Sequence, residues 1–254
     1  MTTSASSLQR NNGGPAGGPT DRPYRLGILG GTFDPPHRGH VALAQLFVEH
    51  LALDELVWIP TGQSWQKGDD VTPAADRLAM TELAAAAVGK TDAVVHASRM
   101  EVDRAGPSYT IDTVRQLREE YGPEASLSWL MGADQLLRLH TWHGWEDLFA
   151  HVHLCVATRP GFDLAELEGP VRASMASRLG DKHLIQSTPS GRMWLDQTLA
   201  VDLSSTGLRA RLARGTPDDD LADDQLPDGV AHYIASHGLY RKARSDSPPN
   251  PNQG

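Results

Sequence analysis

The alternation of apolar strand patterns with helical patterns is the feature that most limits how this chain can fold. From residue 25 onward, short apolar runs bounded by turn residues are each followed by a longer segment with apolar residues every three or four positions. Such alternation is typical of parallel sheets, because each parallel connection needs a crossover segment, usually a helix. The sequence therefore predicts an α/β fold, with a doubly wound parallel sheet in a single domain.

The expected strands and helices can be given by residue range. We expect strands at 25–31, 55–60, 92–98, 126–132, 151–158 and 193–200. We expect helices at 40–53, 73–89, 108–122, 133–139, 204–215 and 228–238, several of them ended by glycine. Alternation of side chains along the fifth strand predicts that His151 and His153 lie at the surface.

The two ends of the chain differ in composition from the part between them. Residues 1–22 are rich in Ser, Asn, Gly and Pro without periodicity, and residues 242–254 have the same character. Both are expected to be disordered tails. The segment 23–241 is expected to be the folded domain, and the hydrophobic share of 39% in 254 residues suffices for a buried core.

Charge and apolar patterning exclude several classes of function. The chain has 23 basic and 32 acidic residues and a net charge of -9, which opposes binding to nucleic acid. No apolar run approaches the length of about 20 residues that spans a membrane, and the first residues lack the apolar core of a secretory signal. Cys155 is the only cysteine and is expected as a buried apolar residue, not a catalytic thiol. We therefore expect a cytoplasmic protein without membrane partners.

The segment GGTFDPPHRGH at 30–40 is the strongest chemical signal in the chain. It joins the first strand to the first helix, and loops at the carboxyl ends of parallel strands line the usual ligand crevice of such sheets. Gly30 and Gly31 let the backbone turn sharply and approach a ligand closely. His37 and His40 stand at the start of the helix, where free amides and the dipole attract anions. The loop therefore predicts a phosphate site to which both imidazoles donate.

Four other interpretations are weaker. A structural role for the two histidines stays open, and a zinc site lacks a neighbouring Cys or carboxylate at ligand spacing, so no protein-bound metal is expected. The loop does not match the dinucleotide motif G-x-G-x-x-G, and no acid ends the second strand to hold a ribose. Gly-Lys-Thr at 89–91 resembles the end of a P-loop, but Ala84 stands where the first glycine is required.

Two segments together resemble the nucleotidyltransferases with an H-x-G-H motif. GGTFDPPHRGH is similar to their first signature, and VDLSSTGLRARL is similar to their second, I-S-S-T-x-x-R, with Leu203 in place of isoleucine. More narrowly, GPSYTIDT, MGADQ, TWHGW and HYIASHGLYR resemble bacterial nicotinate-nucleotide adenylyltransferases. The likeness covers about residues 24–241 and implies a Rossmann-like sheet.

The resemblance also implies roles for individual residues. The catalytic residues it implies are His37, His40 and Arg209, the last expected in the first turn of its helix. The residues implied for ATP and its phosphates are Gly30, Gly31, Thr32, Phe33, Lys67, Ser204, Ser205 and Thr206. Those implied for the nicotinate nucleotide are Thr110, Asp134 and Trp142, although a tryptophan such as Trp142 or Trp145 is also a common core residue. The chain departs from the family at Gln66, which stands where histidine is frequent and cannot carry charge.

The reaction implied by the resemblance is transfer of AMP from ATP to nicotinate mononucleotide. It yields nicotinate adenine dinucleotide and pyrophosphate, a step in NAD biosynthesis, with Mg²⁺ entering together with ATP. Two alternatives stay open: an adenylyltransferase acting on nicotinamide mononucleotide or 4'-phosphopantetheine, and a nucleotide-binding module without catalysis. The oligomeric state also stays open, and a homo-oligomer is compatible with the sequence.

Overall fold

Six parallel strands form one sheet in the order β3-β2-β1-β4-β5-β6. The computed structural model describes residues 22–63, 71–158, 162, 165, 167–199, 205–213 and 225–240. The strands are β1 (Arg25–Gly31), β2 (Glu55–Pro60), β3 (Val94–Ala97), β4 (Ser126–Gly132), β5 (His153–Ala157) and β6 (Met193–Asp196). The strand order confirms the predicted doubly wound parallel sheet. The two predicted tails lie outside the described residues, except for Arg22.

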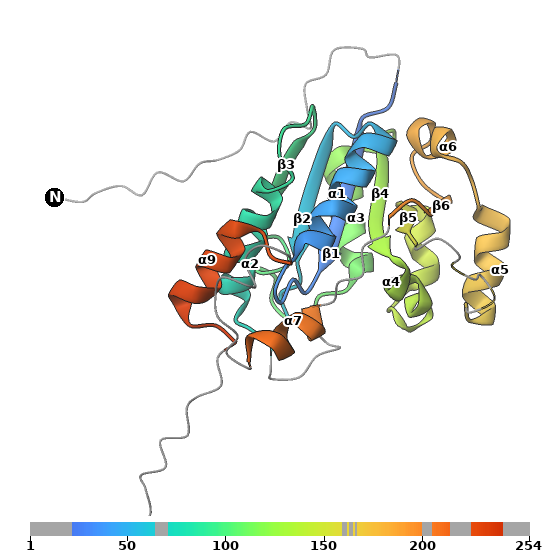
Figure 1. Cartoon of the computed structure of the whole chain (residues 1–254). Helices are drawn as coiled ribbons and strands as arrows, with labels where there is room; N and C mark the ends of the chain where they lie inside the picture. Colours follow the sequence, from blue (N-terminus) through green and yellow to red (C-terminus); the bar gives the residue numbers. More distant parts are fainter. Residues whose placement is uncertain are drawn as a thin grey trace, which may run out of the picture.

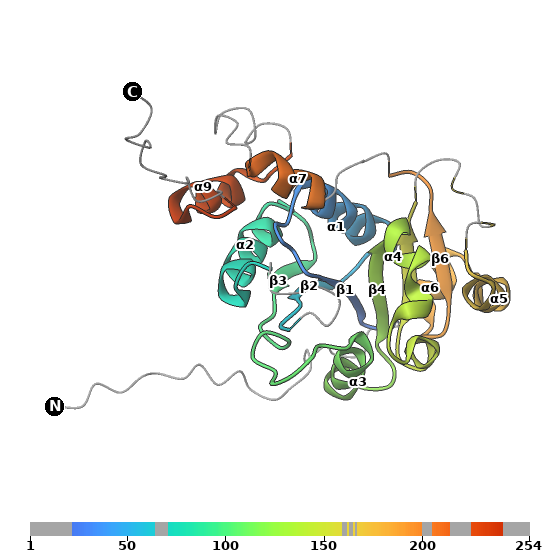
Figure 2. The same cartoon turned by 90° about the horizontal axis from the view of Figure 1, so that it is seen from below.

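Helices cover both faces of the sheet, and Figures 1 and 2 show α1 and α3 on opposite sides of it. The α-helices are α1 (Arg38–Leu51), α2 (Ala74–Ala86), α3 (Thr110–Tyr121), α4 (Ala133–Leu137), α5 (Gly169–Arg178), α6 (Lys182–Ser187), α7 (Ser205–Leu212) and α9 (Asp228–His237). Two short 3-10 helices, η1 (Leu139–Thr141) and η2 (Trp145–Ala150), follow α4. Within the described ranges, no helix has the length and apolar character needed to cross a membrane.

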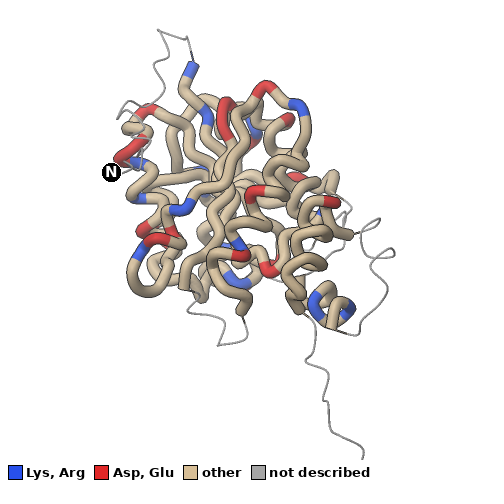
Figure 3. Tube along the Cα trace, turned by 90° about the vertical axis from the view of Figure 1, so that its left-hand side faces the viewer, with Lys and Arg blue, Asp and Glu red and all other residues tan. Residues whose placement is uncertain are grey.

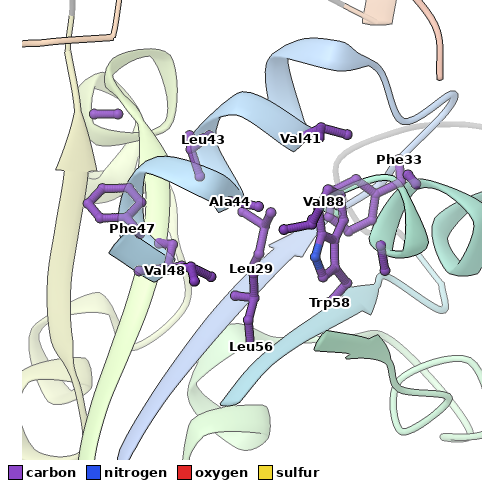
Figure 4. Packing of buried hydrophobic residues seen from close by; sticks show 14 of the residues in the cluster. Leu29, Phe33, Val41, Leu43, Ala44, Phe47, Val48, Leu56, Trp58 and Val88 are labelled. Carbon is purple, nitrogen blue, oxygen red and sulfur yellow. The ribbon is translucent and has the colours of Figure 1, made fainter. Parts of the chain in front are cut away.

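Two hydrophobic clusters hold these layers together, one on each face of the sheet. The first joins α1, α2, α6, α7 and α9 to β1 and β2. Figure 4 shows its centre, where Ala44 of α1 lies over Leu29 of β1, and Trp58 of β2 lies beside Phe33. The second joins α3, α4, α5 and both 3-10 helices to the opposite face. Removal of this apolar surface from water makes the main favourable contribution to the free energy of folding.

The largest difference from the predicted elements lies between β5 and β6, where α5 and α6 were not predicted. Only Val171 and Met175 are buried in α5, and only Ile185 is buried in α6. With so few apolar positions, neither segment shows a clear helical period in the sequence. Elsewhere the boundaries shift by a few residues; for example, α2 ends at Ala86, three residues before the predicted end at Gly89.

The prediction that His153 lies at the surface was wrong, because its side chain is fully buried. Its Nε2 donates to the carbonyl of Thr188 at 2.8 Å, and its Nδ1 accepts from the amide of Arg192 at 3.1 Å. Alternating side chains reach the surface only when one face of the strand is solvated. An internal strand of a doubly wound sheet is covered by helices on both faces. Cys155 on the same strand is buried, as predicted.

The winding direction of the sheet reverses between β1 and β4, which are hydrogen-bonded neighbours. β1 is followed in the chain by β2 on one side, while β4 lies on its other side and leads on to β5. Ligands of open α/β sheets bind outside the carboxyl ends of the strands at such a point. Figure 3 shows Lys and Arg interspersed with Asp and Glu along the described chain, without a continuous basic stripe in this view.

Candidate active site

A cavity of about 580 Å³ opens at the carboxyl ends of β1 and β4. Its walls come from the loop after β1, the start of α3, the junction of β4 with α4, and the start of α7. Most of the predicted site residues line it: Gly30, Gly31, Thr32, His37, His40, Thr110, Asp134, Trp142, Ser205 and Thr206. The fold thus brings segments that are far apart in the sequence into one cavity at the point where the winding reverses.

The remaining predicted site residues do not line this cavity or cannot be located. Phe33 is buried and packs against Trp58, with ring centroids 5.3 Å apart. Arg209 is absent from the described cavity walls, and it lies in the second turn of α7, not in the first as predicted. Lys67 and Ser204, together with the departing Gln66, lie outside the described residues.

The imidazoles of His37 and His40 stack at the start of α1, with ring centroids 3.8 Å apart. The backbone amide of His37 donates to Nδ1 of His40 at 3.1 Å, so a neutral His40 carries its proton on Nε2. His37 is only 5% exposed, and burial lowers its pKa to about 4, with the charge of Asp134 opposing the shift. At neutral pH His37 is therefore uncharged and can act on a phosphate as a hydrogen-bonding group, not as a cation.

The start of α7 is attached to the loop after β1 by side-chain hydrogen bonds. Ser205 Oγ donates to the carbonyl of Pro35 at 3.1 Å. Nη1 of Arg209 donates to the carbonyl of Asp34 at 2.6 Å, and its Nη2 donates to Thr206 Oγ1 at 3.3 Å. The two signature segments therefore meet, as their joint resemblance implied.

Two tryptophans form the part of the cavity near β4. Trp129 is buried, and Trp142 is half-buried and meets it edge to face, with centroids 6.3 Å apart. A Cβ atom on Gly30 would lie 2.3 Å from the ring of Trp129. The structure therefore gives a packing reason for this glycine besides the predicted close approach of a ligand.

Arg77 of α2 is a buried residue of this region that the sequence patterns did not single out. Its side chain is 2% exposed, and its guanidinium donates to four backbone carbonyls at 2.6 to 2.9 Å: Thr32, Thr61, Gly62 and Thr72. It therefore ties the loop after β1 to the loop after β2. The one signal in the sequence is a charged residue next to the buried apolar positions of an alanine-rich helix.

Glu101 is a second residue that the sequence patterns missed. It lines the cavity, is 5% exposed, and accepts a hydrogen bond from Thr113 Oγ1 at 2.5 Å. Burial raises its pKa, so part of its population is protonated at a pH where an exposed glutamate is fully ionised. No local pattern marks Glu101, because its burial depends on α3 packing over it.

Known proteins are similar to this chain over most of its length. Residues 28–211 match the model of the cytidylyltransferase-like family. A protein of Herminiimonas arsenicoxydans named "Probable nicotinate-nucleotide adenylyltransferase" is 44% identical over 218 residues, covering 85% of this chain and 96% of the relative. A protein of Salinispora arenicola with the same name is 41% identical over 215 residues, covering 84% and 100%.

A solved structure supports the same fold. The nicotinic acid mononucleotide adenylyltransferase of Plasmodium falciparum, complexed with NaAD, superposes with a TM-score of 0.61 at 16% identity. The match covers 85% of this chain and 97% of that protein. Since identity and coverage are high for the bacterial relatives and the family model spans most of the described domain, the chain belongs to the cytidylyltransferase-like family and, within it, to the bacterial nicotinate-nucleotide adenylyltransferases.

Proposed function

We propose that this enzyme transfers AMP from ATP to nicotinate mononucleotide, releasing pyrophosphate and forming nicotinate adenine dinucleotide. One observation carries the proposal: His37 and His40, Ser205 and Thr206, and the Thr110, Asp134 and Trp142 set line the same cavity at the switch point of the sheet. The first two sets suit the phosphates of ATP, and the third suits a pyridine nucleotide. The names of the relatives, which are similar over nearly their full length, point to the same reaction.

The chemistry requires no nucleophile from the protein. An oxygen of the 5'-phosphate of nicotinate mononucleotide forms a bond to the α-phosphorus of ATP, and the bond from that phosphorus to the bridging oxygen of the β-phosphate breaks. The attacking group is already an anion, so the enzyme aligns two reactants and stabilises charge on the transferred group. His37 and His40 are the proposed hydrogen-bond donors in the cavity, with Lys67, Ser204 and Arg209 as further proposed phosphate contacts.

We assign Mg²⁺ to this reaction as an ion that enters with ATP. Magnesium bound to a nucleotide is held mainly by phosphates and water, with one or two carboxylates from the protein. The described residues contain no group of three side chains that could hold a metal alone, while Asp134 offers an exposed carboxylate on the cavity wall. This donor set fits an ion carried by ATP, which would neutralise charge on the leaving pyrophosphate.

The reaction is tested by measuring pyrophosphate release from ATP and magnesium with three acceptors in parallel. Nicotinate mononucleotide is expected to support the fastest release, because a site that pairs with its carboxylate is mismatched to a carboxamide. Fast release with only nicotinamide mononucleotide or 4'-phosphopantetheine would show that the proposed acceptor is wrong, while the chain would still be an adenylyltransferase. If no acceptor supports release, the chain is a nucleotide-binding module.

His40→Ala is expected to lower kcat by about 10² to 10³, the usual cost of removing one preorganised donor from a developing charge. The measurement is steady-state pyrophosphate release, with the melting temperature recorded for each protein. His232→Ala, which removes an exposed histidine from α9, is the matched control and is expected to retain full activity. A His40→Ala protein with more than half of the wild-type kcat would remove His40 from the mechanism.

The cytoplasmic location and the homo-oligomer remain predictions that accompany this function. Cell fractionation tests the first, and size-exclusion chromatography with light scattering tests the second.

A further inference from the structure

The segment after α9 contacts the loop after β1, although the two are far apart in the chain. The hydroxyl of Tyr240 donates to Oδ1 of Asp34 at 2.6 Å, across 206 positions of sequence. Asp34 lies within the first signature and is 1% exposed. A hydroxyl that donates to a buried carboxylate forms a charge-assisted hydrogen bond, which is stronger than a bond between neutral groups.

The same carboxylate also faces the segment before α2 and the side chain of Arg209 on α7. The amide of Thr72, just before α2, donates to its Oδ2 at 3.4 Å. Nη1 of Arg209 lies 4.0 Å from the same oxygen while donating to the carbonyl of Asp34. The buried carboxylate of Asp34 therefore links the first signature to the segment before α2, to Arg209 of the second signature and to Tyr240.

The backbone at both ends of the Asp34–Tyr240 bond adopts a conformation that L-residues rarely take. Phe33, which precedes Asp34, has a φ of 50°, and Tyr240 has a φ of 63°. A non-glycine residue in the left-handed region costs free energy and persists only where surrounding contacts determine it. Burial raises the pKa of Tyr240, so its hydroxyl keeps its proton and remains a donor at neutral pH.

We propose that Asp34 and Tyr240 are positioning residues that hold Arg209 and the His37–His40 loop in the arrangement that ATP requires. Without the tyrosine hydroxyl, Oδ1 of Asp34 is a buried acceptor that lacks this donor. Arg209, already within 4.0 Å of the carboxylate, is then drawn away from the Asp34 carbonyl and Thr206. The proposal rests on the function proposed above and adds two residues to those that arrange the ATP site.

Tyr240→Phe tests the proposal because it removes the hydroxyl and keeps the ring. We expect kcat/KM for ATP to fall about tenfold, while KM for nicotinate mononucleotide stays within about twofold. Tyr233→Phe is the matched control: Tyr233 on α9 donates to Asp76 of α2 at 2.9 Å, the same pair of chemical groups but with neither residue in a signature segment. We expect the control to match the wild type in both constants. Equal constants for the two variants, or equal losses toward both substrates, would overturn the proposal.

A second variant and a binding measurement separate this proposal from the proposed reaction. Asp34→Asn keeps the shape of the side chain and removes its charge, and the double variant with Tyr240→Phe should lose no more ATP affinity than the worse single variant. Affinity is measured by calorimetry with magnesium-ATP and no acceptor. Additive losses overturn the coupling between the two residues. If the wild type binds ATP but releases no pyrophosphate, the proposed reaction is wrong, while the ATP affinities of the variants still test the positioning role. If the wild type does not bind ATP, both proposals are wrong.

Discussion

Burial determines the charge state of the two most enclosed histidines in this protein, His37 and His153. Burial lowers the pKa of both to about 4, but the two side chains have different positions. His37 lines the cavity, while His153 joins β5 to the segment before β6. Both ring nitrogens of His153 have backbone partners. A histidine of this kind is a neutral structural group whose protonation opposes folding.

His153 is expected to make the protein less stable in mild acid. Its folded pKa of about 4 lies below the ordinary value of about 6.5, so the unfolded chain binds the extra proton and stability is lost as pH falls between these values. His153→Leu removes the titrating group and leaves two backbone partners unsatisfied, which costs about 1–3 kcal/mol at pH 7.5. The difference in the free energy of unfolding between the wild type and the variant should be about 2 kcal/mol smaller at pH 4.5 than at pH 7.5. Urea unfolding at both pH values measures this difference. A difference that does not change with pH would contradict the lowered pKa of His153.

At the residue scale, the sequence predicted the position of side chains that belong to a local pattern. The His37 and His40 pair could be placed beside the cavity because its loop follows a strand and opens a helix, and the fold brings such loops together. Arg77 and Glu101 could not be found in this way. Their importance comes from backbone carbonyls and hydroxyls supplied by other elements, and no spacing in the sequence encodes those contacts.

The contact between β1 and β4 shows how packing between elements constrains single positions. Gly30→Ala is expected to lower the free energy of unfolding by about 1–3 kcal/mol, because the new Cβ would lie 2.3 Å from the buried ring of Trp129. Displacing Trp129 also disturbs Trp142, so KM for nicotinate mononucleotide should rise. Gly169→Ala at the start of α5 is the control, since a Cβ there meets nothing within 4 Å. Chemical denaturation measures both, and equal stability of the two variants would contradict the packing argument.

All six strands were predictable because they are apolar and bounded by turn residues, whereas α5 and α6 were not. Strands buried on both faces produce continuous apolar runs, such as that of β4, which stand out against polar connections. The amphipathic α3, closed by Gly122, stands out for its helical period. α5 and α6 lie at the margin of the sheet and bury one or two side chains each, so tertiary contacts, not periodicity, define them.

At the scale of the whole molecule, a polar cluster at the amino ends of the strands lies opposite the cavity. Glu55, the first residue of β2, accepts hydrogen bonds from Tyr24 and Tyr121 at 2.9 Å and contacts His96 Nε2 at 2.6 Å. These partners hold the pKa of Glu55 below its ordinary value, despite burial, which acts in the opposite direction. The cluster therefore contributes stability above about pH 4.5 that is lost as the carboxylate becomes protonated in acid.

Glu55→Gln is expected to lower the free energy of unfolding by about 1–3 kcal/mol and to leave kcat/KM unchanged. The amide keeps the size of the side chain but removes the charge that its three partners face. Asp103→Asn is the control, because its pair with Arg99 is exposed to solvent and adds little to the stability of the fold. Thermal unfolding and pyrophosphate release are measured on the same preparations. A loss of activity with unchanged stability would show that the two ends of the sheet are not independent.

The bond between Tyr240 and Asp34 also has a consequence for how the protein is made. A ribosome adds about 5–20 residues per second, so Tyr240 is synthesised roughly 10–40 s after Asp34. During that interval the nascent chain contains the first signature, but this carboxylate still lacks its hydroxyl donor. Under the positioning role proposed for this pair, the ATP site is completed late in biosynthesis, and nucleotide is expected to stabilise the newborn protein most strongly once Tyr240 has reached Asp34.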